Sequence, residues 1–314
     1  MIIVDFTKDW ISAAEQLALE NYREEKLAVP LLPETPNLPS LEKLTENHLG
    51  VAAVEGEELL GFLGAYGPWE PVFCTPNVRG VFTPIHAHGA QRQKRTMIYQ
   101  RMYQAAADKW VAAGASSHAV SLYAHDTAAQ EAFFTYGFGR RCMDLIRDLS
   151  VLPGVVPAQC SYFELPASRQ QEIRHLRKAL SDHLAQSPCF VCQSDEVFRI
   201  WITQRENNPP RTFVAERDGH IVAYMEVTKE GENFVVSSPD IRNICGAYCL
   251  PDYRGENVAP GLLCYITGVL RAEGFARLGV DCESFNPTAL HFWSKYFAAY
   301  THSVVRRIDE KTVG

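Results

Sequence analysis

The sequence lacks the segments that would carry it into or across a membrane. Its first ten residues contain no basic segment followed by an apolar core, so we expect no signal peptide. The uncharged run from Asn257 to Leu270 is too short to span a bilayer and contains a proline. Nine cysteines without a secretory signal favour a reducing compartment and mostly buried thiols. These absences predict a cytoplasmic protein without a membrane partner.

Positive charge is also scarce. The chain has 30 Lys and Arg against 37 Asp and Glu, a formal net charge of −7. Nucleic-acid binders cluster Lys and Arg to contact phosphates, and only residues 92–95 ("RQKR") concentrate basic side chains here. With 46% hydrophobic residues and no low-complexity tract, the composition is that of a globular protein. We therefore expect no nucleic-acid partner.

Sets of metal-ligating residues are incomplete. Cys189 and Cys192 form one CxxC motif, but no second CxxC or HxxxH pair accompanies it. His86 and His88 are two residues apart and lack a nearby carboxylate partner. Zinc at the cysteines is the alternative to two unrelated thiols, and we favour the thiols. No metal site is predicted.

What the chain does contain is a repeat at a distance of about 160 residues. Residues 51–67 and 212–228 each place alternating apolar residues around a Glu-Gly or Asp-Gly turn, which predicts a β-hairpin. Residues 124–141 and 284–301 share the spacing of a polar residue, an alanine and an aromatic ring. Matches in the same order in both halves indicate two homologous domains.

Two glycines support the same division. Gly114 and Gly274 are each predicted to end a helix and keep the same offset. We predict two tandem α/β domains with mixed sheets that splay at the centre, residues 1–152 and 158–314. The join falls in residues 149–162, where proline and glycine interrupt regular structure.

Periodicity and cap residues predict the elements of the second half. We expect helices at 168–186, 194–207 and 258–273, strands near 242–250 and 277–284, and a short helix from 287. The first half opens with an amphipathic helix at 9–26.

Residues 251–263, "PDYRGENVAPGLL", form a turn that leads into the long helix. A helix N-terminus presents free N–H groups and the positive end of the helix dipole, so it can bind phosphate. Gly255 permits close approach of an anion, Asn257 tolerates left-handed geometry, and Pro260 suits a first helical turn. An ordinary strand–helix connection has the same features, and by geometry alone it is the favoured interpretation.

The order of these elements resembles the GNAT superfamily of acyl-CoA-dependent N-acyltransferases. The resemblance rests on a hairpin, a strand, the turn P-x-Y-R-G-x-x-V-A, a long helix, a strand and N-x-x-A-x-x-F-W. It covers most of residues 160–310 and, more weakly, 1–150. The layout of two tandem GNAT-like domains is similar to that of the mycothiol synthases. The resemblance implies acetyl-CoA as cofactor and a small amine as acetyl acceptor.

The family's phosphate-binding pattern, Arg/Gln-x-x-Gly-x-Gly/Ala, falls on Arg254, Asn257 and Ala259. Asn286 stands where the family contacts the pantetheine arm. Two departures matter, because Asn257 replaces a glycine and Trp293 replaces the tyrosine that protonates the departing thiolate. The resemblance assigns to the cofactor Cys249, Leu250, Arg254, Gly255, Glu256, Asn257, Val258, Ala259, Pro260, Asn286 and Trp293.

Acetyl transfer needs a base for the amine and a proton for the leaving thiolate. Glu226 and Glu283 are the candidate bases, with salt-bridged or solvated carboxylates as the competing interpretation. Tyr248 and Tyr296 are candidate acids, or core aromatic residues. Backbone N–H groups near Cys249 and Leu250 are expected to polarise the thioester carbonyl. The predicted catalytic residues are Glu226, Tyr248 and Glu283.

The first half departs further from the family. Its loop in residues 86–103 lacks the Arg-Gly spacing, Phe133 stands at the tyrosine position, and Asp126 stands at the position of Asn286. We expect the C-terminal domain alone to bind acetyl-CoA. The predicted function is acetyl transfer to a small amine, with a non-catalytic acyl-CoA-binding or sensing protein as the alternative. A homodimer is left open.

Overall fold

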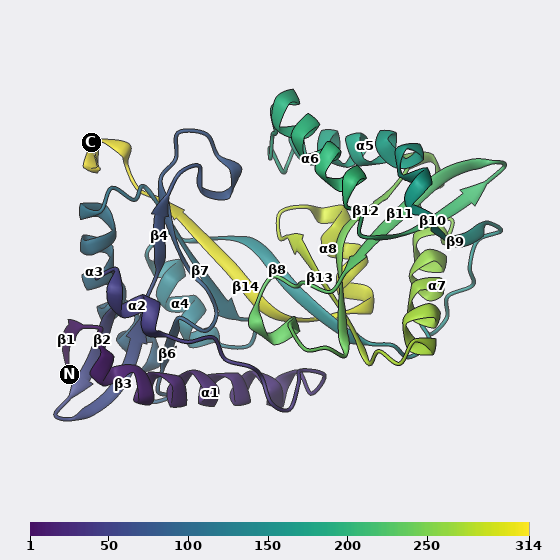
Figure 1. The fold of residues 1–314 in the computed structure, drawn as a ribbon. Helices are drawn as coiled ribbons and strands as arrows, with labels where there is room; N and C mark the ends of the chain where they lie inside the picture. Colours follow the sequence, from purple (N-terminus) through teal and green to yellow (C-terminus); the bar gives the residue numbers. More distant parts are fainter. Residues whose placement is uncertain (314) are drawn as a thin grey trace. The chain divides into compact units, whose positions relative to one another are not determined.

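The computed structural model describes residues 1–313, apart from the side chain of Cys74, and divides into two compact units (Figure 1). The first unit contains Met1–Asp144, Asn233–Val235 and the chain from Ala299 onward; the second contains Leu145–Glu232 and Val236–Ala298. The domain limits expected from the sequence, 1–152 and 158–314, stay a prediction.

The first unit alternates strands and helices. Its helices are α1 (Ile11–Ala28), α2 (Glu42–Glu46), α3 (Arg95–Ala112) and α4 (Thr127–Thr135). Its strands are β1 (Ile2–Asp5), β2 (Val51–Glu55), β3 (Glu58–Leu63), β4 (Tyr66–Trp69), β5 (Gly80–Thr83), β6 (His88–Ala90) and β7 (Ser117–Tyr123), with β8 (Gly139–Asp148) leading into the second unit.

The second unit is also built from both strands and helices. Its strands are β9 (Ser161–Leu165), β10 (Arg211–Arg217), β11 (His220–Thr228), β12 (Ile241–Cys249) and β13 (Arg277–Glu283). Its helices are α5 (Arg174–Ala185), α6 (Asp195–Asn207), α7 (Val258–Ala272) and α8 (Pro287–Tyr296). The helix predicted at 168–186 begins instead as a 3-10 segment, Ala167–Ile173, before α5.

Both predicted hairpins are present. β2 pairs antiparallel with β3, and β10 with β11. The second turn places Asp218 and Gly219 at positive φ (53° and 76°), the backbone that a tight two-residue hairpin requires.

Both predicted helix-ending glycines are also confirmed. Gly114 and Gly274 lie at φ 84° and 88°, just beyond α3 and α7. In each case the glycine N–H and the next N–H bond back to carbonyls of the last helical turn, for example from Phe275 to Leu270 at 3.1 Å.

The first unit holds two strand groups. β1, β2, β3 and β6 form one sheet, and β4, β5 and β7 form part of another. The last strand of the chain, β14 (Ala298–Arg307), pairs antiparallel with β7 along Thr301–Arg307. The first unit is therefore completed by a segment from the far end of the sequence.

In the second unit the strand order is β13-β12-β11-β10-β9. Alternate side chains point to opposite faces. Val214 and Tyr224 pack with Leu176 of α5 on one face, whereas Phe213 packs on Tyr265 of α7 on the other. Figure 1 shows α5 and α6 on one side of β10–β12 and α7 on the other. The mixed α/β fold class predicted from the sequence is confirmed.

Strands β12 and β13 separate halfway along. They pair in parallel only at Ile241–Ile244 with Arg277–Val280. The pairing of β12 with β11 shifts at the same level, because Glu226 opposes Gly246 while Val227 opposes Ile244, which leaves Cys245 as a bulged residue. Beyond the bulge, β12 keeps its partner on the β11 side and opens a wedge toward β13.

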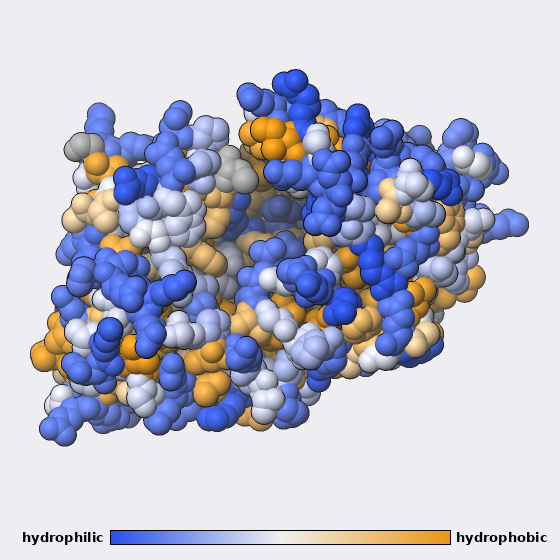
Figure 2. All heavy atoms as spheres, in the orientation of Figure 1, coloured by the Kyte–Doolittle hydropathy of each residue, from blue (hydrophilic) through white to orange (hydrophobic). Residues whose placement is uncertain are grey.

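No helix within residues 1–313 is both long and apolar enough to cross a bilayer. Figure 2 shows mainly hydrophilic side chains on the visible face, with an orange patch over α6. That helix exposes about half of the side chains of Val197 and Ile200.

One buried histidine gives the first unit a dependence on pH. His88 is hydrogen-bonded through both ring nitrogens. Nδ1 lies 2.8 Å from Tyr99 Oη, and Nε2 lies 2.6 Å from the Ser121 carbonyl oxygen. A carbonyl only accepts, so Nε2 carries the proton and Nδ1 is the acceptor. Burial, the largest effect, lowers the pKa of His88 to about 4.

We predict that the free energy of unfolding falls as the pH drops from about 6.5 to about 4, by up to roughly 3 kcal/mol from His88. In this window the unfolded chain binds a proton that the folded chain does not. Urea unfolding at several pH values measures the slope. His88→Gln, which cannot titrate, should show a smaller slope, and equal slopes for the two proteins would contradict this assignment.

Candidate functional site

The wedge between β12 and β13 opens into a cavity of about 570 Å³ within the second unit. Its walls come from both strands, from α5, from the start of α7 and from α8. Most of the residues predicted from the sequence lie around it: Tyr248, Cys249, Arg254, Gly255, Asn257, Val258, Ala259, Pro260, Glu283, Asn286 and Trp293. Glu226, Leu250 and Glu256 do not line it.

The open edge of β12 offers backbone donors to this cavity. Leu250 donates its N–H to Val222 on β11 at 3.0 Å. Because an antiparallel strand alternates the direction of its polar groups, the N–H groups of Ala247 and Cys249 point away from β11 and into the wedge. The expected donor at Cys249 therefore faces the cavity. Leu250 is wrongly placed for that role, since its N–H is already bonded.

The start of α7 provides a second set of donors. Gly255 (φ 81°) and Asn257 (φ 60°) both adopt left-handed geometry, which turns the chain into the helix. The N–H groups of Val258 and Ala259 lie in the first helical turn, where no intrahelical acceptor exists, and the side chain of Asn257 does not cap them. A Cβ placed on Gly255 would meet no atom within 4 Å. The loop is thus an open concave turn at the positive end of a helix.

Charged side chains flank this turn. Arg254 donates from Nε to the Cys249 carbonyl at 2.9 Å, and its guanidinium lies 5.1 Å from the ring centre of Tyr248. Glu256 turns away and pairs with Arg217 at 2.5 Å. Because that pair neutralises Glu256, Arg254 supplies the positive side chain at the turn.

Asn286 and Trp293 both belong to α8. Asn286 is buried and caps the helix, accepting from the N–H of Ala289 at 3.3 Å, and its Oδ1 lies 3.4 Å from His183 Nε2. Trp293 is also buried, with its indole edge-on to Phe292 at 4.7 Å between ring centres. Each side chain has a packing or capping role besides lining the cavity.

Glu226 is the predicted residue that the structure places least favourably for catalysis. Its carboxylate is buried between Arg177, which donates from Nε to Oε1 at 2.9 Å, and Arg205, whose Nη1 lies 3.1 Å from Oε2. The second contact is an ion pair without hydrogen-bond geometry. A carboxylate held by two arginines is a poor base, so the geometry does not support the role predicted for Glu226.

The other predicted catalytic side chains reach the cavity. Glu283 on β13 and Tyr248 on β12 are half-buried in its walls, and Tyr296 of α8 lines it as well. Burial raises the pKa of the Cys249 thiol to about 11 and also raises the pKa of Cys245. Both thiols stay protonated at neutral pH and are poor nucleophiles.

Sequence reasoning missed several lining residues, including His183, Tyr224 and Gly246. Gly246 lies close to Glu226, because a Cβ there would be 2.9 Å from Glu226 Oε2 and would have to displace that carboxylate. Tyr224 opposes Tyr248 across the strand pair, so both rings leave the sheet on the same face. Strand alternation alone would have pointed to Tyr224 once the register was known.

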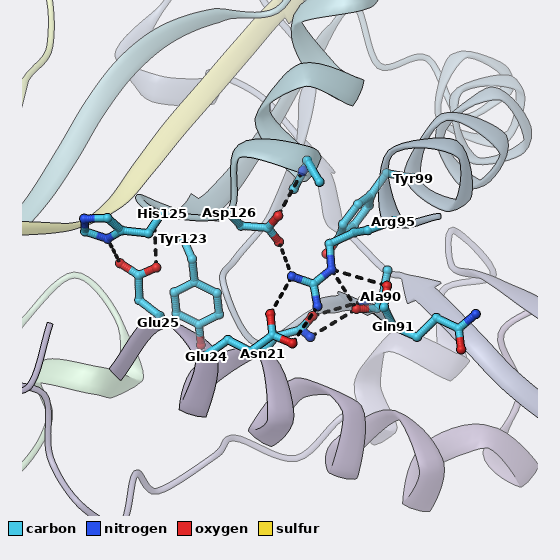
Figure 3. Close-up of polar contacts among 12 residues, drawn as sticks. Asn21, Glu24, Glu25, Ala90, Gln91, Arg95, Tyr99, Tyr123, His125 and Asp126 are labelled. Carbon is cyan, nitrogen blue, oxygen red and sulfur yellow. Dashed lines mark hydrogen bonds and ion pairs between the residues drawn. The ribbon is translucent and has the colours of Figure 1, made fainter. Parts of the chain in front are cut away.

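The corresponding position of the first unit is filled by its own side chains (Figure 3). Helix α3 also follows a left-handed residue, Lys94 (φ 56°). Arg95 at its start is buried and bonds Glu24 at 2.7 and 3.1 Å and Asp126 at 3.2 Å. Asp126 also caps α4 through the N–H of Ala129 at 3.0 Å. The cation at this helix start is therefore already neutralised by two carboxylates.

Within residues 1–313, no three His, Cys, Asp or Glu side chains converge to hold a metal ion. The CxxC thiols point to different carbonyls, Cys189 to Phe285 and Cys192 to Ala185.

Residues 178–298 match a family model described as the Acetyltransferase (GNAT) family. No curated protein matches the chain. The family match falls on the unit that contains the wedge and the turn before α7.

Solved structures share the fold. A GCN5-related N-acetyltransferase from Sphaerobacter thermophilus is 13% identical, with 98% of this chain and 95% of that chain covered and a TM-score of 0.56. A glucosamine N-acetyltransferase region of a fungal multi-domain β-N-acetylglucosaminidase is also 13% identical, with 97% and 38% covered and a TM-score of 0.53. At these identities the likeness shows the fold alone.

The buried position of Glu226 leads to a prediction about stability. Glu226→Ala should lower the free energy of unfolding by about 3–5 kcal/mol, because it leaves Arg177 buried without its counter-charge. Urea unfolding followed by circular dichroism measures the change. Glu283→Ala, in the cavity wall, is the control and should change stability by less than about 0.5 kcal/mol. A small loss for Glu226→Ala would mean that the carboxylate is not structural.

Proposed function

Residues 178–298 belong to the acetyltransferase (GNAT) family, and from this premise we propose that the second unit binds acetyl-CoA and acetylates a small amine. The family and the N-acetyltransferase class predicted from the sequence are confirmed. The observation that carries the proposal is the continuity between the wedge and the turn before α7, since both line one cavity.

The residues of this cavity fit the cofactor in chemistry. A diphosphate would be held by Arg254 and by the uncapped N–H groups at the start of α7, where Gly255 leaves room for close approach. The wedge-facing N–H groups of Ala247 and Cys249 would bond the amide and carbonyl oxygens of the acyl arm. When bound, acetyl-CoA supplies a thioester whose acyl carbon can accept the amine's lone pair.

The chain's own residues would manage the protons. Glu283 would take a proton from the ammonium form of the acceptor, because its carboxylate lines the cavity and pairs with no described cation. Tyr248 or Tyr296 would donate a proton to the leaving thiolate. Apolar side chains in the cavity walls, such as Leu180 of α5 and the buried Trp293 of α8, would limit the access of water to the thioester.

A non-catalytic acyl-CoA-binding protein is the second candidate. Trp293 favours it, because an indole has no proton to donate at the position where the family has a tyrosine. Tyr296, one helical turn further along α8, also lines the cavity and carries such a proton.

Paired glycine variants test the cofactor site. Gly255→Ala and Gly219→Ala both place a side chain at positive φ in open space, so each should lose about 1–2 kcal/mol of stability. Only Gly255→Ala should weaken acetyl-CoA binding, by roughly tenfold in calorimetry. Thiol release across a panel of amines then separates enzyme from sensor. Equal acetyl-CoA affinity in both variants would place the phosphates elsewhere.

The number of acetyl-CoA molecules bound per chain tests whether the second unit alone binds the cofactor. We expect one acetyl-CoA per chain, because the first unit's helix start is occupied by the Arg95 ion pairs. Asn286→Asp keeps a capping oxygen but adds a charge beside an anionic cofactor, so binding should weaken by about 1–3 kcal/mol. The reciprocal Asp126→Asn should leave affinity unchanged. Two molecules bound per chain would refute this assignment.

A further inference from the structure

A cluster of polar side chains lies against the bulge on the face of the sheet covered by α5 and α6. We call it the Glu226 cluster, and it contains Arg177, Arg205, Tyr224 and Glu226. Two arginines surround one carboxylate, so the cluster has an excess of one positive charge. Arg177 is fully buried, whereas the side chain of Arg205 is 21% exposed. The partly exposed side chain of Arg205 therefore carries the excess positive charge of the cluster.

Arg205 is held in a fixed position. Its Nη1 lies 3.4 Å from Cys245 Sγ and 3.1 Å from Glu226 Oε2, and its guanidinium lies 5.3 Å from the ring centre of Trp201. Cys245 lines the cavity. The arginine thus stands directly behind the bulged residue of β12, at the point where the wedge begins.

The hydroxyl of Tyr224 has no hydrogen-bond partner among the described residues. The residue is 1% exposed and lines the cavity, yet its Oη makes no hydrogen bond to any described residue. A buried hydroxyl without a partner costs about 1–3 kcal/mol. Burial, the largest effect, raises the pKa of Tyr224, so the hydroxyl remains a neutral donor at any working pH. Such a donor is satisfied when a ligand brings an acceptor oxygen.

The opposite side of the wedge has the opposite charge. Glu283 on β13 lines the cavity, and no described cation forms an ion pair with it. The cavity therefore has the Tyr224 hydroxyl in one wall, with the charge of Arg205 behind Cys245, and the carboxylates of Asp281 and Glu283 on β13. A ligand with a cationic amine and a neighbouring anion would complement both sides.

We infer that the acetyl acceptor is a zwitterion of the α-amino-acid type, whose carboxylate is bound by Tyr224 Oη and attracted by the charge of Arg205 behind Cys245, and whose amine faces Glu283. This inference rests on the proposed function and names its substrate class. The donors lie on the face covered by α5 and α6, whereas the phosphate turn lies at α7 on the other face. The two substrates would thus enter the wedge from opposite sides of the sheet.

The test compares matched acceptors: L-phenylalanine, its amide and 2-phenylethylamine, with the same series built on alanine. With saturating acetyl-CoA, kcat/KM for the acids should exceed that for the amides and amines by about tenfold or more. Tyr224→Phe should raise KM for the acids about tenfold more than it raises KM for the simple amines. Its melting temperature should not fall, because the hydroxyl bonds nothing in the fold.

Tyr265→Phe is the matched control, since Tyr265 lies on α7 and packs on Phe213 outside the cavity lining. Arg205→Gln should abolish the preference for acids. If Arg205→Gln does not fold, Tyr224→Phe still tests whether the acceptor's carboxylate is bound at this place. Calorimetric titration of each acid, amide and amine in the presence of CoA tests the inference without turnover. A failure of acetyl transfer would then count against the proposed function alone.

Two results would overturn the inference. One is equal kcat/KM and equal affinity for acid, amide and amine in the parent protein. The other is a loss of kcat in Tyr224→Phe that is the same for every acceptor, because the hydroxyl would then serve the thioester rather than the acceptor's carboxylate.

Discussion

The buried carboxylate of Glu226 is the constraint on which the second unit depends. Two arginines from separate helices converge on it, and its Oε2 lies so close to β12 that a Cβ at position 246 would have to displace the carboxylate. The strand bulges at the neighbouring residue, Cys245, and parts from β13 at the same level. The ion-pair cluster, the glycine, the bulge and the wedge are therefore one local arrangement. Burying these charges costs desolvation free energy, and the buried ion pairs lie where β12 departs from regular strand pairing.

The two faces of the sheet in the second unit carry different kinds of polar group. In the proposed function, backbone donors and the N-terminus of α7 would bind the phosphates and the acyl arm. The side chains under α5 and α6 supply fixed charges near the point where the strands part. In the proposed function, such a site would bind the cofactor mainly through backbone groups and the acceptor mainly through side chains.

In the first unit, the corresponding helix start is occupied by side chains of the protein itself. Its helix α3 starts from a left-handed residue, as α7 does, but Arg95 turns inward and is neutralised by Glu24 and Asp126. Next to them, Glu25 accepts from the backbone and the ring of His125 at 3.1 and 2.7 Å (Figure 3). These ion pairs satisfy the helix start from within the protein. The helix start of the first unit is thereby part of that unit's own structure.

Local chemistry let the sequence by itself determine much of this protein. The hairpin turn at Asp218-Gly219, the glycine helix ends, the cap at Ser194 and the turn before α7 all depend on residues within a few positions of one another. The family assignment follows from the order of these elements.

Tertiary structure alone decided the rest, because the deciding contacts join residues far apart in the chain. Arg177 meets Glu226 across 49 positions and makes it structural, which a strand pattern cannot reveal. The register of β11 on β12 turned Leu250 toward Val222 and brought Tyr224 beside Tyr248. Whether a polar side chain is satisfied or left facing a cavity depends on such distant partners, and these are fixed only when the sheet and its helices pack together.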